Sequence, residues 1–191
     1  MEDSLFIDQP VQYEAILEAT NKLSFNMNSD LYTGSLLKTL VASKLNSRIL
    51  ELGTGGGLAT SWILEGMDPT SRLVTIENNA ALLEIAKQQL ADARIEFILA
   101  DGYEWLKQYA GKKFDLIFAD AMPGKYDLFE ETIALLKPGG FYIIDDMLPQ
   151  PNWPAGHAKR VYDFLNKLDN QKDLVLTKMN WSTGIIIAVR K

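Results

Sequence analysis

The sequence predicts an α/β fold with a doubly wound, mostly parallel sheet of seven strands. Short apolar runs that suit buried strands alternate with segments whose apolar residues recur at helical spacing, from about residue 46 onward. The first of these strands ends in a run of glycines that is typical of a ligand-binding turn. A length of 191 residues suits a single domain, which we expect to comprise an N-terminal helical segment over residues 1–45 and the sheet with its helices over residues 46–191.

Local patterns indicate each strand and helix. Strands are apolar runs bounded by turn residues, whereas helices carry apolar positions three and four apart with polar residues between them. The last two strands are close together in the chain and are expected to pair antiparallel. Strands are predicted at residues 49–52, 73–77, 95–99, 114–120, 141–145, 174–179 and 184–189. Helices are predicted at residues 11–23, 31–45, 58–65, 79–91, 103–109, 127–136 and 158–168.

The residues Lys137-Pro138-Gly139-Gly140 separate the sixth predicted helix from the fifth strand. Proline stops a helix because it lacks a backbone N–H, and glycine permits the positive φ of a sharp reversal. We therefore expect a turn at these four residues.

Composition and charge restrict the classes of partner. The formal net charge is −6 and basic residues occur at most in adjacent pairs, so we expect no nucleic-acid partner. No run approaches the roughly 18 apolar residues of a membrane span, so no membrane partner is expected either. The acidic residues 1–4 are unlike a secretory signal, and the absence of cysteine is compatible with a reducing compartment. We therefore expect a cytoplasmic protein.

The stretch over residues 49–57 predicts a buried strand that ends in a tight glycine-rich turn. Gly53, Gly55 and Gly57 allow positive φ and let a ligand lie against bare main chain. Glu77 ends the next strand, 24 residues after Gly53, close to the offset of roughly 20 residues at which a carboxylate binds ribose hydroxyls. A nicotinamide dinucleotide is the alternative ligand, but its G-x-G-x-x-G pattern needs a small sixth residue, and Leu58 stands there.

Acidic residues follow the strands on both sides of this turn. They are Glu51 before the glycines, Glu77 at the end of the second strand, Asp101 after the third, Asp120 at the end of the fourth and Asp145-Asp146 at the end of the fifth. Together with residues 137–140, this spacing resembles that of the class I S-adenosylmethionine-dependent methyltransferases. The further order of residues 29–37, Asp120 with Tyr126, and Asp145-Asp146 is similar to the cation-dependent O-methyltransferases of the catechol and caffeoyl-coenzyme A type. The resemblance implies a Rossmann-like fold, S-adenosylmethionine as cofactor, and methyl transfer to a hydroxyl oxygen of a small-molecule acceptor.

The resemblance also implies roles for individual residues. Asp120, Lys125 and Asp145 are expected to be catalytic, and Asp120, Asp145 and Asp146 are expected to hold Mg²⁺ if the reaction uses a cation. Parallel strands bring their carboxyl ends to one edge of a sheet, which would let these carboxylates converge. The expected cofactor-binding residues are Met27, Glu51, Gly53, Thr54, Gly55, Gly57, Glu77, Asn78, Asp101, Gly102, Asp120 and Ala121.

Two positions depart from the family's pattern. Asp146 stands where the last ligand pair is usually Asp-Asn, and Pro123 stands three residues after Asp120, where the family has a lysine that helps to deprotonate the acceptor. Lys125 replaces that lysine only if the Pro123-Gly124 turn redirects it; otherwise it is a solvated loop residue. The metal requirement therefore stays open, as do a nitrogen or protein acceptor and a non-catalytic module that binds S-adenosylmethionine.

Aromatic side chains near the strand ends are candidates for the acceptor site. Trp153, between two prolines, suits the wall of a cavity for an aromatic acceptor. His157 is the only histidine, and we interpret it as a loop residue because no partner can be placed beside it. The helical segment over residues 11–23 is expected to cover either the site or a second subunit, which leaves a homodimer open. Further candidates for the same cavity are Tyr13, Phe25 and Trp181.

Overall fold

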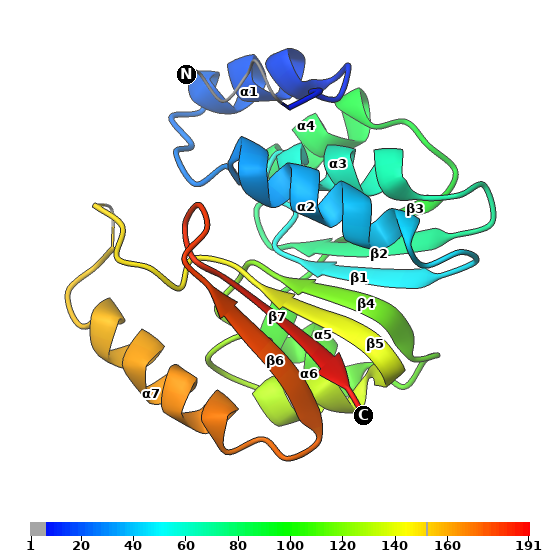
Figure 1. Cartoon of the computed structure of the whole chain (residues 1–191). Coiled ribbons are helices and arrows are strands. Elements are labelled where there is room, and N and C mark those ends of the chain that lie inside the picture. The colour runs from blue at the N-terminus through cyan, green and yellow to red at the C-terminus, as the bar shows by residue number, and fades with distance from the viewer. Residues whose placement is uncertain (1–6, 152) are drawn as a thin grey trace.

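The computed structural model describes residues 7–151 and 153–191, and its centre is a seven-stranded sheet (Figure 1). The strand order is β3-β2-β1-β4-β5-β7-β6, with β1 to β5 parallel and β7 antiparallel to both β5 and β6. The predicted fold class is confirmed, including the antiparallel C-terminal pair. The acidic residues 1–4 lie outside the described residues.

The observed strands and helices follow the predicted alternation. The strands are β1 (Arg48–Leu52), β2 (Arg72–Glu77), β3 (Ile95–Leu99), β4 (Phe114–Ala119), β5 (Leu136–Ile144), β6 (Leu174–Met179) and β7 (Ile185–Arg190). The helices are α1 (Tyr13–Lys22), α2 (Leu31–Ala42), α3 (Leu58–Gly66), α4 (Ala80–Gln89), α5 (Gly102–Gln108), α6 (Phe129–Ala134) and α7 (His157–Asp169).

Helices cover both faces of the sheet. Consecutive residues of its central strands are therefore apolar, because the side chains on both faces are buried. On one face, Ile49 of β1 and Phe118 of β4 pack with α2 and α3. On the other face, Leu50 and Ile117 of the same strands pack with α5, α6 and α7. Consecutive residues of one strand are therefore buried in two separate hydrophobic layers.

The predicted turn at residues 137–140 is wrong, because these residues lie within β5. Leu136 pairs with Phe114 at the start of β4, and the next aligned pair is Phe141 with Leu116. The partner strand thus advances by two residues while β5 advances by five, so the intervening residues form a bulge, with Gly139 at a φ of 74°. Proline and glycine interrupt the ladder here without ending the strand.

Several predicted boundaries also differ from the observed ones. Helix α2 ends at Ala42 instead of residue 45, α6 occupies only Phe129–Ala134, and β4 ends at Ala119, so that Asp120 lies just beyond the strand. The start of α2 is defined by Asp30, whose side chain accepts hydrogen bonds from the backbone amides of Tyr32 and Thr33. In the part of the chain that the structure describes, no helix is long and apolar enough to cross a membrane.

Candidate functional site

Three adjoining cavities lie at the carboxyl ends of the parallel strands. The central cavity, of about 310 Å³, is built on the glycine turn; the α5-side cavity, of about 230 Å³, lies toward α5; and the β5-side cavity, of about 490 Å³, lies toward β5 and α7. The central cavity shares Gly53 and Glu77 with the α5-side cavity, and Ser29 and Asp120 with the β5-side cavity. Together they form one continuous depression at the edge where ligands bind in such sheets.

The glycine turn places bare main chain against the central cavity. Gly53 has a φ of 100°, and a Cβ at this position would lie 2.7 Å from the backbone oxygen of Asp120. The backbone N–H groups of Gly53 and Thr54 both donate to the carbonyl oxygen of Ile76, at 3.0 and 3.1 Å. Only glycine fits at position 53. Its lack of a side chain allows the turn after β1 to approach both β2 and the end of β4 beneath the cavity.

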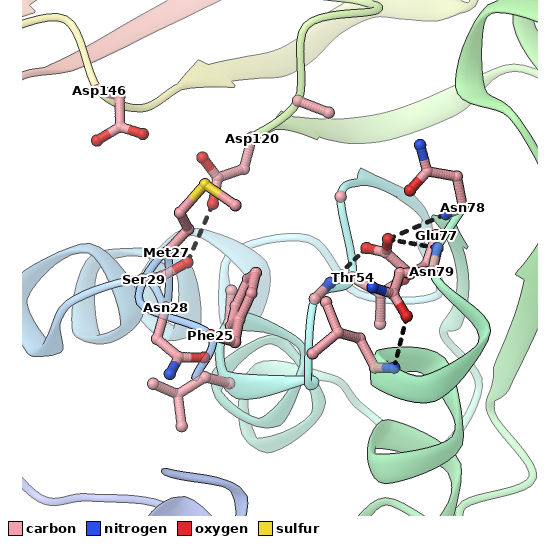
Figure 2. A pocket seen from close by; sticks show the side chains of 16 residues that line it. Phe25, Met27, Asn28, Ser29, Thr54, Glu77, Asn78, Asn79, Asp120 and Asp146 are labelled. Atoms are coloured by element: carbon pink, nitrogen blue, oxygen red, sulfur yellow. Dashed lines mark hydrogen bonds between the residues drawn. The ribbon is translucent and has the colours of Figure 1, made fainter. Parts of the chain in front are cut away.

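Glu77 connects the glycine turn to the start of α4 (Figure 2). Its Oε2 accepts from the Gly55 amide at 2.8 Å, and its Oε1 accepts from the amides of Asn78 and Asn79 at 3.0 and 2.9 Å. A carboxylate has about four acceptor positions, so this side chain retains capacity for a ligand hydroxyl. Glu77 lines both the central and the α5-side cavities.

The structure gathers most of the expected cofactor-binding residues around these cavities. Asp101 and Gly102 line the α5-side cavity, where Asp101 also caps α5 by accepting from the amides of Tyr103 and Glu104. The two interpretations of Asp101, as a helix cap and as a ligand-facing residue, are thus compatible. Those that line the central cavity are Met27, Gly53, Thr54, Gly55, Glu77, Asn78, Asp120 and Ala121.

Glu51 and Gly57 are placed elsewhere. Glu51 is fully buried behind the turn, where its Oε2 accepts from the hydroxyls of Thr60 and Thr75 at 2.6 Å each. Removal from water is the main reason that the pKa of Glu51 rises to about 7. A Cβ on Gly57 would lie 2.9 Å from Ala86 of α4, so this glycine permits close packing between α3 and α4. Neither residue lines the three cavities described above.

Three carboxylates stand at the acidic end of the β5-side cavity. Asp120 lines it together with Asp145 and Asp146, and the Asp120 Oδ2 accepts from the hydroxyl of Ser29 at 3.1 Å (Figure 2). Removal from water and the nearby charge of Asp145 raise the pKa of Asp120 well above its ordinary value. The pKa of Asp145 is raised by the same two causes, with Asp146 as the neighbouring charge. A positive group nearby would stabilise the ionised form of these carboxyls.

Lys125 supplies a positive charge at this end of the cavity. Its side chain is only 4% exposed, and its Nζ donates to the backbone oxygen of Asp145 at 2.8 Å. The Pro123-Gly124 turn directs it there: Gly124 has a φ of 85°, and its amide donates to the Asp127 oxygen at 2.7 Å. Lys125 is therefore not a solvated loop residue.

The carboxylates do not fit the ligand set of a divalent cation. Among residues 7–151 and 153–191, no three acidic or histidine side chains form a group that could hold a metal ion. Asp145 already uses its Oδ1 to accept from the Thr183 hydroxyl and from the Asp146 amide, at 2.7 Å for the latter. The structure thus brings Asp120, Asp145 and Asp146 to one cavity without forming from them the three-carboxylate ligand group that the resemblance implied.

Aromatic rings also line the β5-side cavity. The Tyr126 hydroxyl and His157 Nε2 are 3.1 Å apart, and the His157 and Trp153 rings have centroids 4.6 Å apart. Removal from water lowers the pKa of His157, and the charge of Lys125 acts in the same direction. Trp153, the candidate for the wall of the acceptor site, lines this cavity. His157 lies beside Tyr126, a partner that the sequence patterns did not indicate.

Other aromatic candidates are distributed differently. Phe25 lines the central cavity, beside Gly55. Trp181 contacts Tyr32 edge to face, and neither it nor Tyr13 lines the three cavities described. Thr183, which no local sequence signal indicated, reaches the site from the segment before β7.

Comparisons with known proteins agree with this geometry. The profile of a family described as a methyltransferase domain matches residues 50–147, about half of the chain. The chain is 32% identical over 143 residues to a Mycobacterium avium protein whose name assigns it provisionally to the O-methyltransferases, covering 70% of this chain and 64% of the relative. It is 31% identical over 120 residues to the catechol O-methyltransferase of Mycobacterium tuberculosis, covering 60% of this chain and 54% of the relative. The chain thus spans somewhat less than two thirds of these relatives' lengths.

Solved structures show the same fold over nearly the whole chain. The O-methyltransferase TomG from Streptomyces achromogenes, in complex with SAM, superposes with a TM-score of 0.83 at 24% identity, covering 98% of this chain and 93% of that one. The O-methyltransferase from Bacillus cereus, in complex with SAH, gives a TM-score of 0.85 at 22% identity, with 98% and 94% coverage. The profile match, together with the cavities at the sheet edge, shows that the chain belongs to the methyltransferase-domain family.

Proposed function

We propose that this protein transfers a methyl group from S-adenosylmethionine to a hydroxyl oxygen of a small, aromatic acceptor. The observation that carries the proposal is the contact between two unlike cavities. One is built on bare main chain and Glu77, and the other is lined by both aromatic rings and buried charged groups. Asp120 and Ala121 line both cavities, so a reaction between two ligands would take place beside them.

The central and α5-side cavities suit a nucleoside with a cationic tail. Glu77 has acceptor capacity for ribose hydroxyls, and the α5-side cavity, with Asp101 at its edge, is left for the base. Gly53 and Gly55 remove the side chains that would block a ligand's approach. The central cavity carries Asp120 and Asp146 but no lysine or arginine among its described lining residues, which favours a sulfonium cation over a pyrophosphate.

The β5-side cavity suits an aromatic acceptor. Tyr126, Trp153 and His157 offer ring faces and edges, while Asp120 and Lys125 offer polar groups at the end next to the central cavity. A planar acceptor that packs on the rings would present its hydroxyl to those polar groups. The catechol O-methyltransferase among the relatives supports the same class of acceptor.

The chemistry of the transfer divides between the ligands and the chain. Bound S-adenosylmethionine supplies a methyl group on cationic sulfur, which the acceptor's oxygen takes as the C–S bond breaks and its electron pair stays on sulfur. The hydroxyl proton passes to the carboxylate of Asp120, which lines both cavities. Ser29 holds that carboxylate through its hydroxyl, and the cavity walls position the two reactants.

Calorimetric titration and a methyl-transfer assay test this proposal. We expect S-adenosylmethionine and S-adenosylhomocysteine to bind with one site per chain and NAD⁺ not to bind. Labelled methyl transfer to a panel of catechols, aliphatic alcohols, amines and a protein mixture should favour the catechols. Binding of NAD⁺ without either sulfur ligand would contradict the cofactor assignment. Binding of S-adenosylmethionine with transfer only to amines or protein would contradict the acceptor class.

A further inference from the structure

Lys125 has hydrogen-bonding capacity that faces the proposed acceptor cavity. Its ammonium group has three protons, and among the described contacts it donates one hydrogen bond, to the Asp145 backbone oxygen at 2.8 Å. The same side chain lines the β5-side cavity while remaining 4% exposed. A buried ammonium with unused protons is placed to donate to a ligand oxygen in that cavity.

Lys125 shares the cavity with two carboxylates and an imidazole, Asp120, Asp145 and His157. Lys125 lowers the pKa of both Asp120 and Asp145, against the stronger effect of their removal from water. It is also close enough to His157 to lower the pKa of the imidazole.

The main chain holds Lys125 in this position. A short bridge pairs Pro123 with Asp127, and the Tyr142 hydroxyl donates to the Gly124 backbone oxygen. Gly124 has a φ of 85°, which favours glycine, and a Cβ there would also press on the Leu52 side chain. Tyr142 belongs to β5 and its side chain is fully buried, so its hydrogen bond to Gly124 attaches the turn to the sheet.

We propose that the ammonium of Lys125 does the work of a divalent cation in this protein: it stabilises the negative charge that develops on the acceptor oxygen, and methyl transfer proceeds without a metal ion. The inference rests on the proposed function. It accounts for Asp145, whose carboxylate oxygen accepts from the Thr183 hydroxyl and the Asp146 amide, and for the presence of a buried lysine beside the carboxylates in the acceptor cavity. The acceptor's proton still passes to Asp120, and the new C–O bond still replaces the C–S bond.

Metal binding can be measured without knowing the acceptor. The full chain, freed of metal by chelation, is titrated with Mn²⁺ in the presence of S-adenosylhomocysteine, and free Mn²⁺ is followed by electron paramagnetic resonance. We expect the free signal to rise as in buffer, which means no stoichiometric binding. Stoichiometric Mn²⁺ binding would overturn the inference. Failure of S-adenosylhomocysteine to bind would instead overturn the proposed function, which keeps the two failures distinguishable.

Activity provides the second measurement. With an acceptor from the panel, EDTA should leave kcat/KM unchanged within about twofold, whereas a loss that Mg²⁺ restores would overturn the inference. Lys125→Met should lower kcat/KM by about 10²-fold, as removal of a donor to a developing oxyanion does, while the affinity for S-adenosylhomocysteine stays the same. Wild-type kcat/KM in this variant would also overturn the inference.

Matched variants control for loss of folding. Lys159→Met removes an exposed lysine that pairs with Asp163 on α7, and it should match the wild type in every assay. Thermal unfolding reports whether Lys125→Met is folded. If it is not, Lys125→Arg, which keeps the positive charge, is expected to remain folded and to retain activity in EDTA; an EDTA-sensitive Lys125→Arg would count against the inference.

Discussion

The buried carboxyl of Glu51 makes the stability of this fold depend on pH. The side chain is fully buried, and its Oε1 has no hydrogen-bond partner in the described part of the chain. Removal from water raises its pKa from 4.5 to about 7, with a smaller contribution from the charge of Glu77, while the hydroxyls of Thr60 and Thr75 act in the opposite direction. Folding therefore favours the neutral form of this carboxyl.

The sign and size of the effect follow from these two pKa values. Below pH 4.5 the carboxyl is neutral in both the unfolded and the folded chain, so its contribution to the free energy of unfolding is fully present. As the pH rises toward 7, the unfolded chain ionises first, and the contribution is lost. The difference between the two pKa values corresponds to about 3 kcal/mol.

Glu51→Gln isolates this effect, because glutamine is a neutral side chain of similar shape whose carbonyl oxygen can accept from the same two threonines. The free energy of unfolding of the variant, minus that of the wild type, should increase by about 3 kcal/mol from below pH 4.5 to above pH 7. Urea denaturation at a series of pH values measures it. Glu84→Gln, at an exposed position on α4, is the matched control and should follow the wild type. Parallel curves for Glu51→Gln and the wild type would refute the reasoning.

Three further predictions concern the cavities. Gly53→Ala should lower the free energy of unfolding by about 1–3 kcal/mol in urea denaturation, because its Cβ would collide with the backbone oxygen of Asp120 at a φ of 100°; wild-type stability would contradict it. Glu77→Ala should weaken S-adenosylhomocysteine binding by about tenfold or more in calorimetry, since three main-chain amides and the ligand lose an acceptor. Trp153→Ala should raise KM for an aromatic acceptor severalfold with little effect on S-adenosylhomocysteine affinity, and an unchanged KM would remove Trp153 from the acceptor wall.

The fold could be predicted because its signals are local. The alternation of buried strands and amphipathic helices predicts a parallel sheet. A parallel sheet in turn predicts that ligands bind at the carboxyl ends of its strands. Gly53, Glu77 and Asp101 each lie at the carboxyl end of a strand or just beyond it, so their position at that edge followed from strand order alone. Some helix and strand boundaries shifted by a few residues, as at the end of α2, which lies at Ala42 instead of residue 45.

The predictions from sequence were wrong or incomplete at residues whose environment depends on distant parts of the chain. The motif at residues 137–140 has the composition of a turn, yet the pairing of Leu136 with Phe114 keeps it inside β5. Glu51 is acidic and precedes the glycine turn, yet its side chain points into the protein toward Thr60 and Thr75. Strand register and side-chain direction depend on the neighbouring strands, which local sequence does not contain.

By itself, the sequence determined the doubly wound sheet, the glycine turn and the carboxylates that end its strands, because hydrophobic periodicity and glycine conformation act over a few neighbouring residues. Only the tertiary structure decided that Lys125 is buried against Asp145, that His157 meets Tyr126, and that Thr183 reaches the same cavity. These contacts join residues 20, 31 and 38 positions apart. They form only when separate elements pack on one sheet, and the packing of those elements decides which charges share a cavity.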